Sequence, residues 1–237
     1  MTRLRWIADE VNQDRAALTG EHAAHLSRTL RARVGQEFEV VCGDRVRHAT
    51  VFSVSDDRVE FTLGEEIAGG TVVPVTLLLA VFKFDRMEWA IEKCTELNVT
   101  TIVPVIARRT EKHLALAADK RVERWRRIAR EASEQARRVS PPEIGEPVKL
   151  PAALNTAADA RIVLSESERE LQLSEILRAR PDTNSLALAI GPEGGWTAEE
   201  VQLFSSAGWI AASLGETILR AETAAIAALA VAQAEMS

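Results

Sequence analysis

The chain has 237 residues, of which 46% are hydrophobic and 27% are charged, and its formal net charge is −6. This length is enough for one large domain or two small ones, and the composition is that of a globular protein. No run of about 18 apolar residues occurs, which argues against a membrane-spanning helix. The first residues also lack the apolar core of a signal peptide, so we expect a cytoplasmic protein.

The charges are unevenly distributed along the chain. Residues 108–138 contain eleven Lys or Arg and five Asp or Glu, a local net charge of +6, so the rest of the chain carries −12. Such asymmetry can give an acidic protein a basic face that binds nucleic acid. The alternative is an ordinary solvated helix face, and charge alone leaves both open.

The two cysteines, Cys42 and Cys94, are far apart and in unrelated contexts. This spacing does not resemble a metal site or a disulfide framework. We expect both to be small buried side chains and expect no metal.

Residues 1–70 have the pattern of a small β domain. Turn-forming pairs at Gly43-Asp44 and Asp56-Asp57 separate runs in which apolar and polar residues alternate. The expected strands are 38–44, 47–55 and 58–66, after one helix over 21–31 that starts at Thr19 or Gly20. The pattern predicts a small barrel with one helix, and Gly69-Gly70 mark a linker.

From residue 72 onward the pattern changes to alternating strands and helices. The continuous apolar run 75–82 indicates a strand buried on both faces. A helix over 85–97 follows, with Asp85 as its N-cap. Further strands are expected over 100–107, 160–166, 185–191 and 209–215, and further helices over 119–138, 173–179, 197–208 and 221–236. This order predicts an α/β domain over 71–237 with a mostly parallel sheet.

Three loops after these strands carry unusual residues. They are "VLSESERE" (163–170), "IGPEGGWTAEE" (190–200) and "LGETILRAET" (214–223). Open parallel sheets bind ligands at the carboxyl ends of their strands. We therefore expect the three loops to form one site.

The second loop is rich in glycine, which permits positive φ and close approach of the backbone to a ligand. Its glycines are Gly191, Gly194 and Gly195. Thr197 and Glu200 have the spacing of a capping box, so a helix starts just after the glycines. The loop matches neither GxxxxGK[ST] nor GxGxxG, and Glu193 would repel a phosphate. It therefore favours a neutral or cationic ligand, unless it is only a structural turn.

The third loop places two apolar residues, Ile218 and Leu219, before an alanine-rich helix. They could cover one side of a flat ring, or they could belong to the core. Arg220 and Glu222 flank the start of this helix. A carboxylate at that position is also favoured by the helix dipole, which is the simpler explanation of Glu222.

Together with these loops, three other blocks resemble one known family. The blocks are "HLSRTLRARVGQ" (25–36), "KFDRMEWAIEKCTELNVTTIVPVIARRTEK" (83–112) and "EASEQARRVSPPEI" (131–144), followed by "IGPEGG" (190–195) and "LGETILRAETA" (214–224). In this order they resemble the SPOUT-class 16S rRNA (uracil-N3)-methyltransferases, the RsmE family. The chain departs from the family pattern at Ala136, Arg137 and Arg138, where Ser or Cys and then Gly-Arg are usual, and in the turn that follows.

The resemblance implies a PUA-like RNA-binding barrel over 1–70 and a SPOUT methyltransferase domain with a trefoil knot over 71–237. It also implies a homodimer that binds S-adenosylmethionine and acts on 16S rRNA of the small ribosomal subunit. The implied cofactor-binding residues are Leu164, Ser165, Glu166, Ile190, Gly191, Pro192, Gly194, Gly195, Leu214, Gly215, Ile218, Leu219 and Arg220.

The implied reaction methylates N3 of a uridine. This nitrogen carries a proton with a pKa of about 9 to 10, comparable to a phenol, so a base or a stabiliser of the uracil anion is needed. N3 lies on the pairing edge, so the base must be unpaired or flipped out. We expect Arg220 to stabilise the anion, Glu222 to act as base or orienting group, and Arg109 to reach the target.

Basic residues in both halves of the chain are candidates for binding the RNA backbone. They are Arg28, Arg31, Arg33, Arg108, Arg109, Lys112, Arg137 and Arg138. Arg31 and Arg33 could instead be ordinary surface charges. Arg126, Arg127 and Arg130 are expected on a solvated helix face.

Two other functions are consistent with parts of the sequence. A related knotted methyltransferase could modify a ribose 2′-hydroxyl, but the N-terminal block and the third loop disfavour this. An RNA-binding protein without catalysis would have no reason to retain the cofactor loops.

Overall fold

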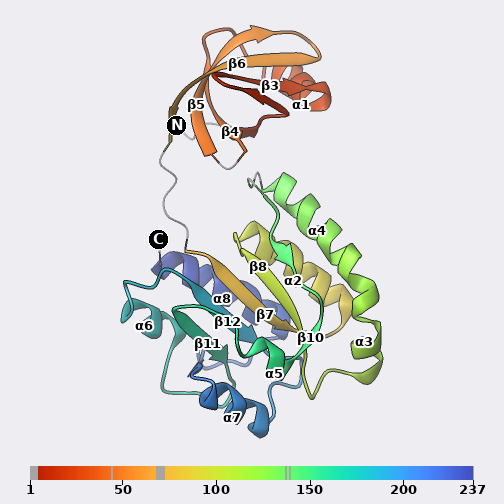
Figure 1. Ribbon diagram of the computed structural model, residues 1–237, viewed down its shortest axis with the longest axis vertical. Helices are drawn as coiled ribbons and strands as arrows, with labels where there is room; N and C mark the ends of the chain where they lie inside the picture. Colours follow the sequence, from red (N-terminus) through yellow and green to blue (C-terminus); the bar gives the residue numbers. More distant parts are fainter. Residues whose placement is uncertain (1–4, 44, 68–72, 137, 139, 237) are drawn as a thin grey trace. The chain divides into compact units, whose positions relative to one another are not determined.

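The computed structural model describes residues 5–43, 45–67, 73–136, 138 and 140–236 (Figure 1). The chain divides into two compact units. The first is Met1–Gly70 with Arg137–Ser140, and the second is Thr71–Ala136 with Pro141–Ser237. The predicted linker glycines at 69–70 and the predicted RNA contact Arg137 lie outside the described residues.

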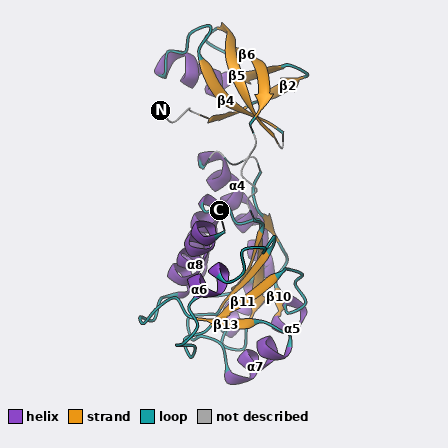
Figure 2. Cartoon of the chain, turned by 90° about the vertical axis from the view of Figure 1, so that its left-hand side faces the viewer, coloured by secondary structure: helices purple, strands orange, loops and turns teal. Residues whose placement is uncertain are grey.

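The first unit is a six-stranded sheet in the order β1-β4-β5-β6-β3-β2 (Figure 2). Its strands are β1 (Arg5–Ile7), β2 (Glu10–Asn12), β3 (Arg15–Thr19), β4 (Glu37–Cys42), β5 (Arg45–Val54) and β6 (Arg58–Glu66). Neighbouring strands are antiparallel, except that β1 is parallel to β4. Ala8 donates its N–H to Val41 in β4, and Asp9 donates to Ala17 in β3. The segment 5–12 thus pairs with both ends of the run β4-β5-β6-β3 and curves the sheet into a half-barrel.

The predicted helix of this unit starts where expected but is not a regular α-helix. Thr19 is the N-cap of α1 (Gly20–Ala24), and the chain continues as a π-helix, η1 (His25–Thr29). Leu26 in η1 is fully buried and packs into the core with Leu18, Val40 and Phe61. The helix therefore closes the open side of the half-barrel core.

The second unit is a parallel seven-stranded sheet, which confirms the predicted α/β class. Its order is β10-β8-β7-β12-β11-β13, with β9 paired to β8. The strands are β7 (Val75–Ala80), β8 (Thr101–Ile106), β9 (Glu143–Ile144), β10 (Val148–Lys149), β11 (Ala160–Leu164), β12 (Leu186–Ile190) and β13 (Ile210–Ala212). Every pair is parallel, so all carboxyl ends lie at one edge of the sheet.

Helices cover both faces of this sheet, as its apolar strands require. They are α2 (Phe84–Glu96), α3 (Lys112–Ala117), the 3₁₀ turn η2 (Asp119–Arg121), α4 (Val122–Gln135), α5 (Leu150–Ala153), α6 (Leu173–Arg178), α7 (Ala198–Ser206) and α8 (Ala221–Glu235). Leu77 and Leu79 of β7 pack in a core with residues of α2, α4, α6 and α8. Leu78, between them, packs in a second core with residues of α5 and α7. Figure 2 shows α6 and α8 on one side of the sheet and α5 and α7 on the other.

Two predicted helix boundaries are wrong. Helix α2 starts at Phe84 with Lys83 as the N-cap residue, so Asp85 lies in the first turn and is not the cap. The expected single helix over 119–138 is the 3₁₀ turn η2 followed by α4, which ends at Gln135. Local capping patterns could not locate these ends, because no side chain caps either helix start.

At the end of β13, residues 212 and 213 form backbone hydrogen bonds with chain segments on both of their sides. Ser165, next to the end of β11, donates its N–H to Ala212. Ser213 donates to the carbonyl of Leu171 at 2.8 Å, and Leu173 donates to the carbonyl of Ser213 at 3.0 Å. The two ends of the segment 165–173 therefore lie on opposite sides of residues 212–213.

Candidate functional site

Five chain segments meet at the carboxyl edge of the parallel sheet. Three are the predicted loops, which leave β11, β12 and β13, and the other two follow β7 and β8. Side-chain hydrogen bonds and ion pairs join four of the five. Arg86 after β7 pairs with Glu193 after β12 and with Glu222 after β13, and Arg109 after β8 donates to the carbonyl of Gly194. The sequence predicted the loops, but the strand order decided which of them touch.

The glycine loop needs its glycines for two different reasons. Of the three, only Gly195 uses the positive φ that glycine permits, at +69°. The other two glycines permit close packing instead. A Cβ on Gly191 would lie 3.3 Å from the Trp196 Nε1, and one on Gly194 would lie 3.3 Å from the Arg109 Cδ. Side chains at these positions would displace the walls of the loop.

Trp196 lies under this loop and was not predicted as a site residue. It is 8% exposed, and its ring stacks edge-on with Phe204 of α7 at 4.9 Å between centroids. Its indole N–H is buried and has no hydrogen-bond partner. Indole groups in protein interiors usually find an acceptor, so an unpaired buried donor beside the glycine loop is unusual. An aromatic residue directly after a glycine run was the signal in the sequence.

The predicted capping box forms and does more than start a helix. Thr197 Oγ1 accepts the N–H of Glu200 at 3.3 Å, and Glu200 Oε2 accepts the N–H of Thr197 at 2.9 Å. The other oxygen, Oε1, accepts the N–H of Arg108 at 2.8 Å. Glu200 is only 2% exposed, so these are buried charge-assisted bonds. These hydrogen bonds hold the segment after β8 against the end of the glycine loop.

Arg86 is a second residue that the sequence reasoning missed. Its Nη1 lies 3.1 Å from Glu193 Oε1 and 3.8 Å from Glu222 Oε1. It follows the carboxyl end of β7, and that position was the available signal. The predicted conflict between Glu193 and an anionic ligand is therefore eased by a neighbouring guanidinium.

The predicted residues of the third loop differ in their exposure to solvent. Gly215 has φ +129°, and its N–H donates to Ser213 Oγ at 3.1 Å. Ile218 is 78% exposed, so the alternative that it belongs to the core is wrong. Leu219 and Leu214 are half-buried. The exposed apolar Ile218 is free to contact another molecule.

The two residues expected to do chemistry at α8 differ in environment. Arg220 is exposed and is the N-cap residue of the helix, without a side-chain cap. The Glu222 side chain is 5% exposed, and its Oε2 is buried without a hydrogen-bond partner. Neither hydrogen bond nor ion pair joins Arg220 to Glu222 or Arg109 among the described residues.

The first loop contributes its residues to the same edge. Leu164 and Ser165 are half-buried at the end of β11. A Cβ on Gly195 would lie 3.7 Å from the Glu166 carboxylate, so this side chain faces the glycine loop. Glu168 accepts the backbone N–H groups of Glu170 and Leu171, which lower the pKa of its carboxyl group and fix the turn. Ile190 and Pro192, predicted in the second loop, are buried.

Several arginines of the basic stretch 108–138 are paired within the protein. Arg124 forms a bidentate pair with Glu88 of α2, and Arg126 contacts Glu123, Glu146 and the carbonyl of Ile144. Because these guanidinium groups are already paired, the local net charge of +6 overestimates the positive charge that this stretch can offer to RNA. The exposed cations of these segments include Arg108, Arg109 and Lys112 after β8, Arg169 in the first loop and Arg220 in the third.

The other predicted RNA contacts lie in the first unit. Arg28 pairs with Asp56 at 3.1 Å in an exposed ion pair. Arg31 is exposed and has φ +51°, and Arg33 is exposed next to it. Arg138, which groups with this unit, is half-buried, and burial lowers the pKa of its guanidinium.

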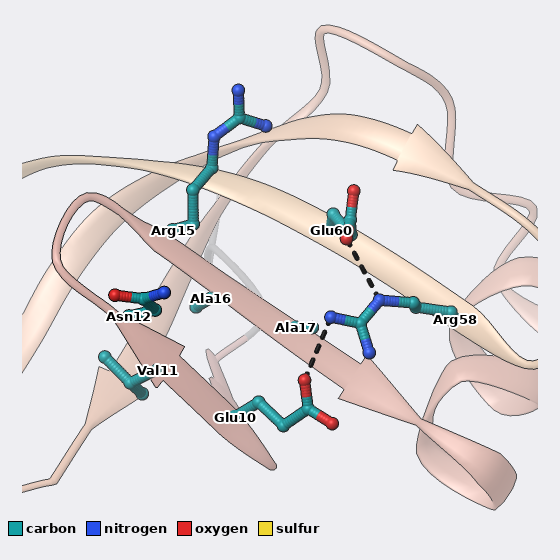
Figure 3. Close-up of a pocket in the computed structure, with 8 residues that line it drawn as sticks. All are labelled: Glu10, Val11, Asn12, Arg15, Ala16, Ala17, Arg58 and Glu60. Atoms are coloured by element: carbon teal, nitrogen blue, oxygen red, sulfur yellow. Dashed lines mark hydrogen bonds and ion pairs between the residues drawn. The ribbon is translucent and has the colours of Figure 1, made fainter.

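A hollow of about 440 Å³ lies on the first unit between β2, β3 and β6 (Figure 3). Arg58 spans it between Glu10 at 2.9 Å and Glu60 at 3.0 Å. These hydrogen bonds raise the pKa of the guanidinium, and the two carboxylates offset its positive charge. The hollow is therefore not built to hold phosphate.

Comparison with known proteins identifies the family. The family model described as RNA methyltransferase domain matches residues 71–233. The chain is 31% identical over 232 residues to the ribosomal RNA small subunit methyltransferase E of Synechocystis sp., covering 96% of this chain and 76% of that one. It is also 31% identical to the Bacillus subtilis protein of that name, covering 90% and 87%. The chain belongs to the ribosomal RNA small subunit methyltransferase E family.

The fold of this family member agrees with that of a solved relative. The crystal structure of a ribosomal RNA small subunit methyltransferase E from Neisseria gonorrhoeae bound to S-adenosylmethionine superimposes with a TM-score of 0.71 at 29% identity, covering 98% of this chain and 97% of that one. The likeness therefore spans both units.

Within the described part of this methyltransferase-family chain, no cluster of three or more His, Cys, Asp or Glu could hold a metal ion. A separate search of the same residues finds no helix that is long and apolar enough to cross a membrane. Both free cysteines are described, and only Cys94 is fully buried, whereas Cys42 is half-buried.

Proposed function

We propose that this chain is an S-adenosylmethionine-dependent methyltransferase that methylates N3 of a specific uridine in 16S rRNA of the small ribosomal subunit. The observation that carries the proposal is the meeting of three loops at one sheet edge, in a member of the small-subunit methyltransferase family. The similar Neisseria protein was crystallised with this cofactor. Because the substrate is ribosomal RNA, we place the activity in the cytoplasm.

The residues at this edge fit the cofactor. The loops offer backbone groups and tight glycine turns rather than the lysine of a phosphate loop, and the cofactor has no phosphate to neutralise. The buried, unpartnered indole N–H of Trp196 offers a further donor beside the glycine loop. We expect the cofactor to be held by Leu164, Ser165, Glu166, Ile190, Gly191, Pro192, Gly194, Gly195, Leu214, Gly215, Ile218, Leu219 and Arg220.

When bound, S-adenosylmethionine supplies a methyl group on a positively charged sulfur. The carboxylates at the edge, Glu166, Glu193 and Glu222, are suited to such a cation, since Arg86 offsets only part of their charge. The sequence alone did not explain Glu193, whose carboxylate would repel a phosphate. Beside a positively charged ligand this carboxylate is favourable.

The protein must also remove a proton from N3 of the uracil. Glu222 is our candidate base, because its Oε2 is buried and has no hydrogen-bond partner. Arg220 is exposed at the N-terminus of α8 and can approach the uracil oxygens, where negative charge develops as the proton leaves. Arg109, fixed by its bond to Gly194, is the third candidate for contact with the base.

The family assignment also supports proposals about architecture. Residues 212–213 are bonded on one side to Ser165 and on the other to Leu171 and Leu173, as expected where a chain passes through a loop in a trefoil knot. The half-barrel of the first unit fits a PUA-like RNA-binding domain. We further propose a homodimer, in which the exposed Ile218 has a partner to contact.

RNA binding is proposed to use exposed cations in both units. In the second unit these are Arg108, Arg109 and Lys112. In the first unit, Arg28, Arg31 and Arg33 are the candidates, together with Arg137 and Arg138. Phosphate contacts of this kind give affinity that falls steeply with salt.

The decisive experiment maps N3-methyluridine in 16S rRNA from a strain that lacks the gene. The methyl group blocks the pairing edge, so primer extension stops at the modified base. We expect the stop to vanish in the deletion strain and to return when the gene is restored. A stop that persists in the deletion strain would refute the substrate assignment, while calorimetry with S-adenosylmethionine tests cofactor binding separately.

A further inference from the structure

One guanidinium connects two loops of the site. Arg86 on α2 lies 3.1 Å from Glu193 in the glycine loop and 3.8 Å from Glu222 in the first turn of α8. The first contact is a hydrogen bond, and the second is a longer ion pair. The Arg86 side chain is 32% exposed, so solvent screens it only partly. Three segments from three strands, β7, β12 and β13, are thereby tied to one side chain.

The position of Glu222 in a helix N-terminus is not enough to explain it. A carboxylate in the first turn gains from the helix dipole, but it can do so while exposed to water. Here the side chain is 5% exposed and Oε2 has no hydrogen-bond partner. Burying an unpaired carboxylate oxygen is costly, and folded proteins rarely retain such an atom without a use. The cation that lies 3.8 Å from its other oxygen offsets part of this cost.

We propose that Arg86 is a positioning residue for methyl transfer, which pairs with Oε1 of Glu222, leaves Oε2 without a competing partner and ties this carboxylate to the cofactor-binding glycine loop. This inference rests on the proposed function, since it assigns Arg86 a role in the same site. Arg86 touches neither substrate nor cofactor in this role and acts through Glu222 and Glu193.

The geometry makes two separable contributions. Through Glu222, Arg86 affects the chemical step, which appears in kcat. Through Glu193, it affects the position of the glycine loop, which appears in the Kd of S-adenosylmethionine. A lysine at this position would keep the charge, but its single ammonium group lacks the planar fork that serves two carboxylates from one side chain. Arg86→Lys should therefore recover part of the loss and Arg86→Gln none of it.

The test uses the full-length protein and four variants, with kcat and KM measured on small subunits from the deletion strain and Kd measured by calorimetry. The variants are Arg86→Gln, Arg86→Lys, Glu222→Gln and the double variant Arg86→Gln/Glu222→Gln. The matched control is Arg124→Gln, which also removes an arginine paired with a glutamate, but its partner is Glu88 of α2 and not Glu193 or Glu222. Thermal unfolding of each variant reports whether the fold is intact.

We expect Arg86→Gln to lower kcat at least tenfold and to raise the Kd of the cofactor severalfold, with Arg86→Lys intermediate and Arg124→Gln near wild type. The double variant should lose little more kcat than Glu222→Gln alone, because both changes disable one carboxylate. If Arg86→Gln does not fold, the graded loss in Arg86→Lys carries the test.

The inference is overturned if an active wild type and Arg86→Gln have the same kcat, or if Arg124→Gln loses as much. It is also overturned if the losses in the double variant multiply, since Arg86 would then act independently of Glu222. A wild type that binds S-adenosylmethionine but leaves the rRNA unmethylated would instead overturn the proposed substrate. The two failures are therefore distinguishable.

Discussion

Replacing Glu200 by alanine should destabilise the second unit and loosen its ligand-binding edge. The Glu200 carboxylate is 2% exposed and accepts two backbone N–H groups, from Arg108 at 2.8 Å and from Thr197 at 2.9 Å. Glu200→Ala leaves both donors without this acceptor. It also frees the segment after β8, whose Arg109 is bonded to the carbonyl of Gly194.

The magnitude follows from the number and kind of bonds. A hydrogen bond to a charged group contributes about 1.5–3 kcal/mol, and Glu200 makes two. Burial means that solvent screening does not reduce this value much. Because both bonds share one carboxylate, and water can replace part of the loss, we expect a loss of about 3–4 kcal/mol in the free energy of unfolding. Glu200→Gln keeps one acceptor oxygen and should lose roughly half as much.

Urea unfolding followed by tryptophan fluorescence measures this loss. Four of the five tryptophans, Trp89, Trp125, Trp196 and Trp209, lie in the second unit, so the signal reports mainly on it. Glu199→Ala is the matched control, since Glu199 is the exposed neighbour in the same helix turn, and its loss should stay below about 1 kcal/mol. A loss of less than about 1 kcal/mol in the free energy of unfolding of Glu200→Ala would refute the view that this carboxylate holds together the segments after β8 and β12.

Three further predictions concern the glycine loop, the thiols and the basic residues. Gly195→Ala should cost about 1–2 kcal/mol of stability, measured by urea unfolding, because φ is +69° there, and it should weaken cofactor binding in calorimetry. Thiol titration of the native protein should leave Cys94 unmodified, since burial raises its pKa to about 12, while the half-buried Cys42 reacts slowly. Lys112→Ala should reduce the salt dependence of rRNA binding by about one ion, whereas Arg126→Ala should not, because the Arg126 guanidinium is already paired.

Each of these has a clear contrary result. Wild-type stability in Gly195→Ala would mean that the loop relaxes out of the left-handed conformation. Modification of Cys94 at the rate seen in denaturant would show that α2 opens readily, with Cys42 as the internal comparison. Equal salt slopes for the Lys112 and Arg126 variants would remove Lys112 from the RNA-binding surface.

The sequence was most informative where one local pattern had one structural solution. The continuous apolar run at 75–82 predicted a strand buried on both faces, and β7 places alternate residues in two different cores. The Thr197–Glu200 spacing predicted a capping box, and it forms. The starts of α2 and α4 were placed wrongly. Neither has a capping side chain, so the sequence contained no local pattern that marks the first residue.

Short elements in the first unit were also missed. Strands β1 and β2 have three residues each, and β3 begins with an arginine, so none of them shows a sustained alternation. They are strands because each has an edge to pair with: β1 pairs with β4, β3 with β6, and β2 with β3. Pairing with a distant strand depends on the tertiary structure, and a three-residue segment is too short to show a pattern that predicts it.

By itself, the sequence determined the α/β class of the second unit, the three loops that leave its strands and the family to which the chain belongs. These follow from periodicity and from residues adjacent along the chain. Only the tertiary structure decided that Arg86 lies between Glu193 and Glu222, that Glu200 holds Arg108, and that Trp196 and Glu222 bury unpartnered polar atoms. The physical reason is the order of the parallel strands, which brings residues 92 and 107 positions apart along the chain together at one edge of the sheet.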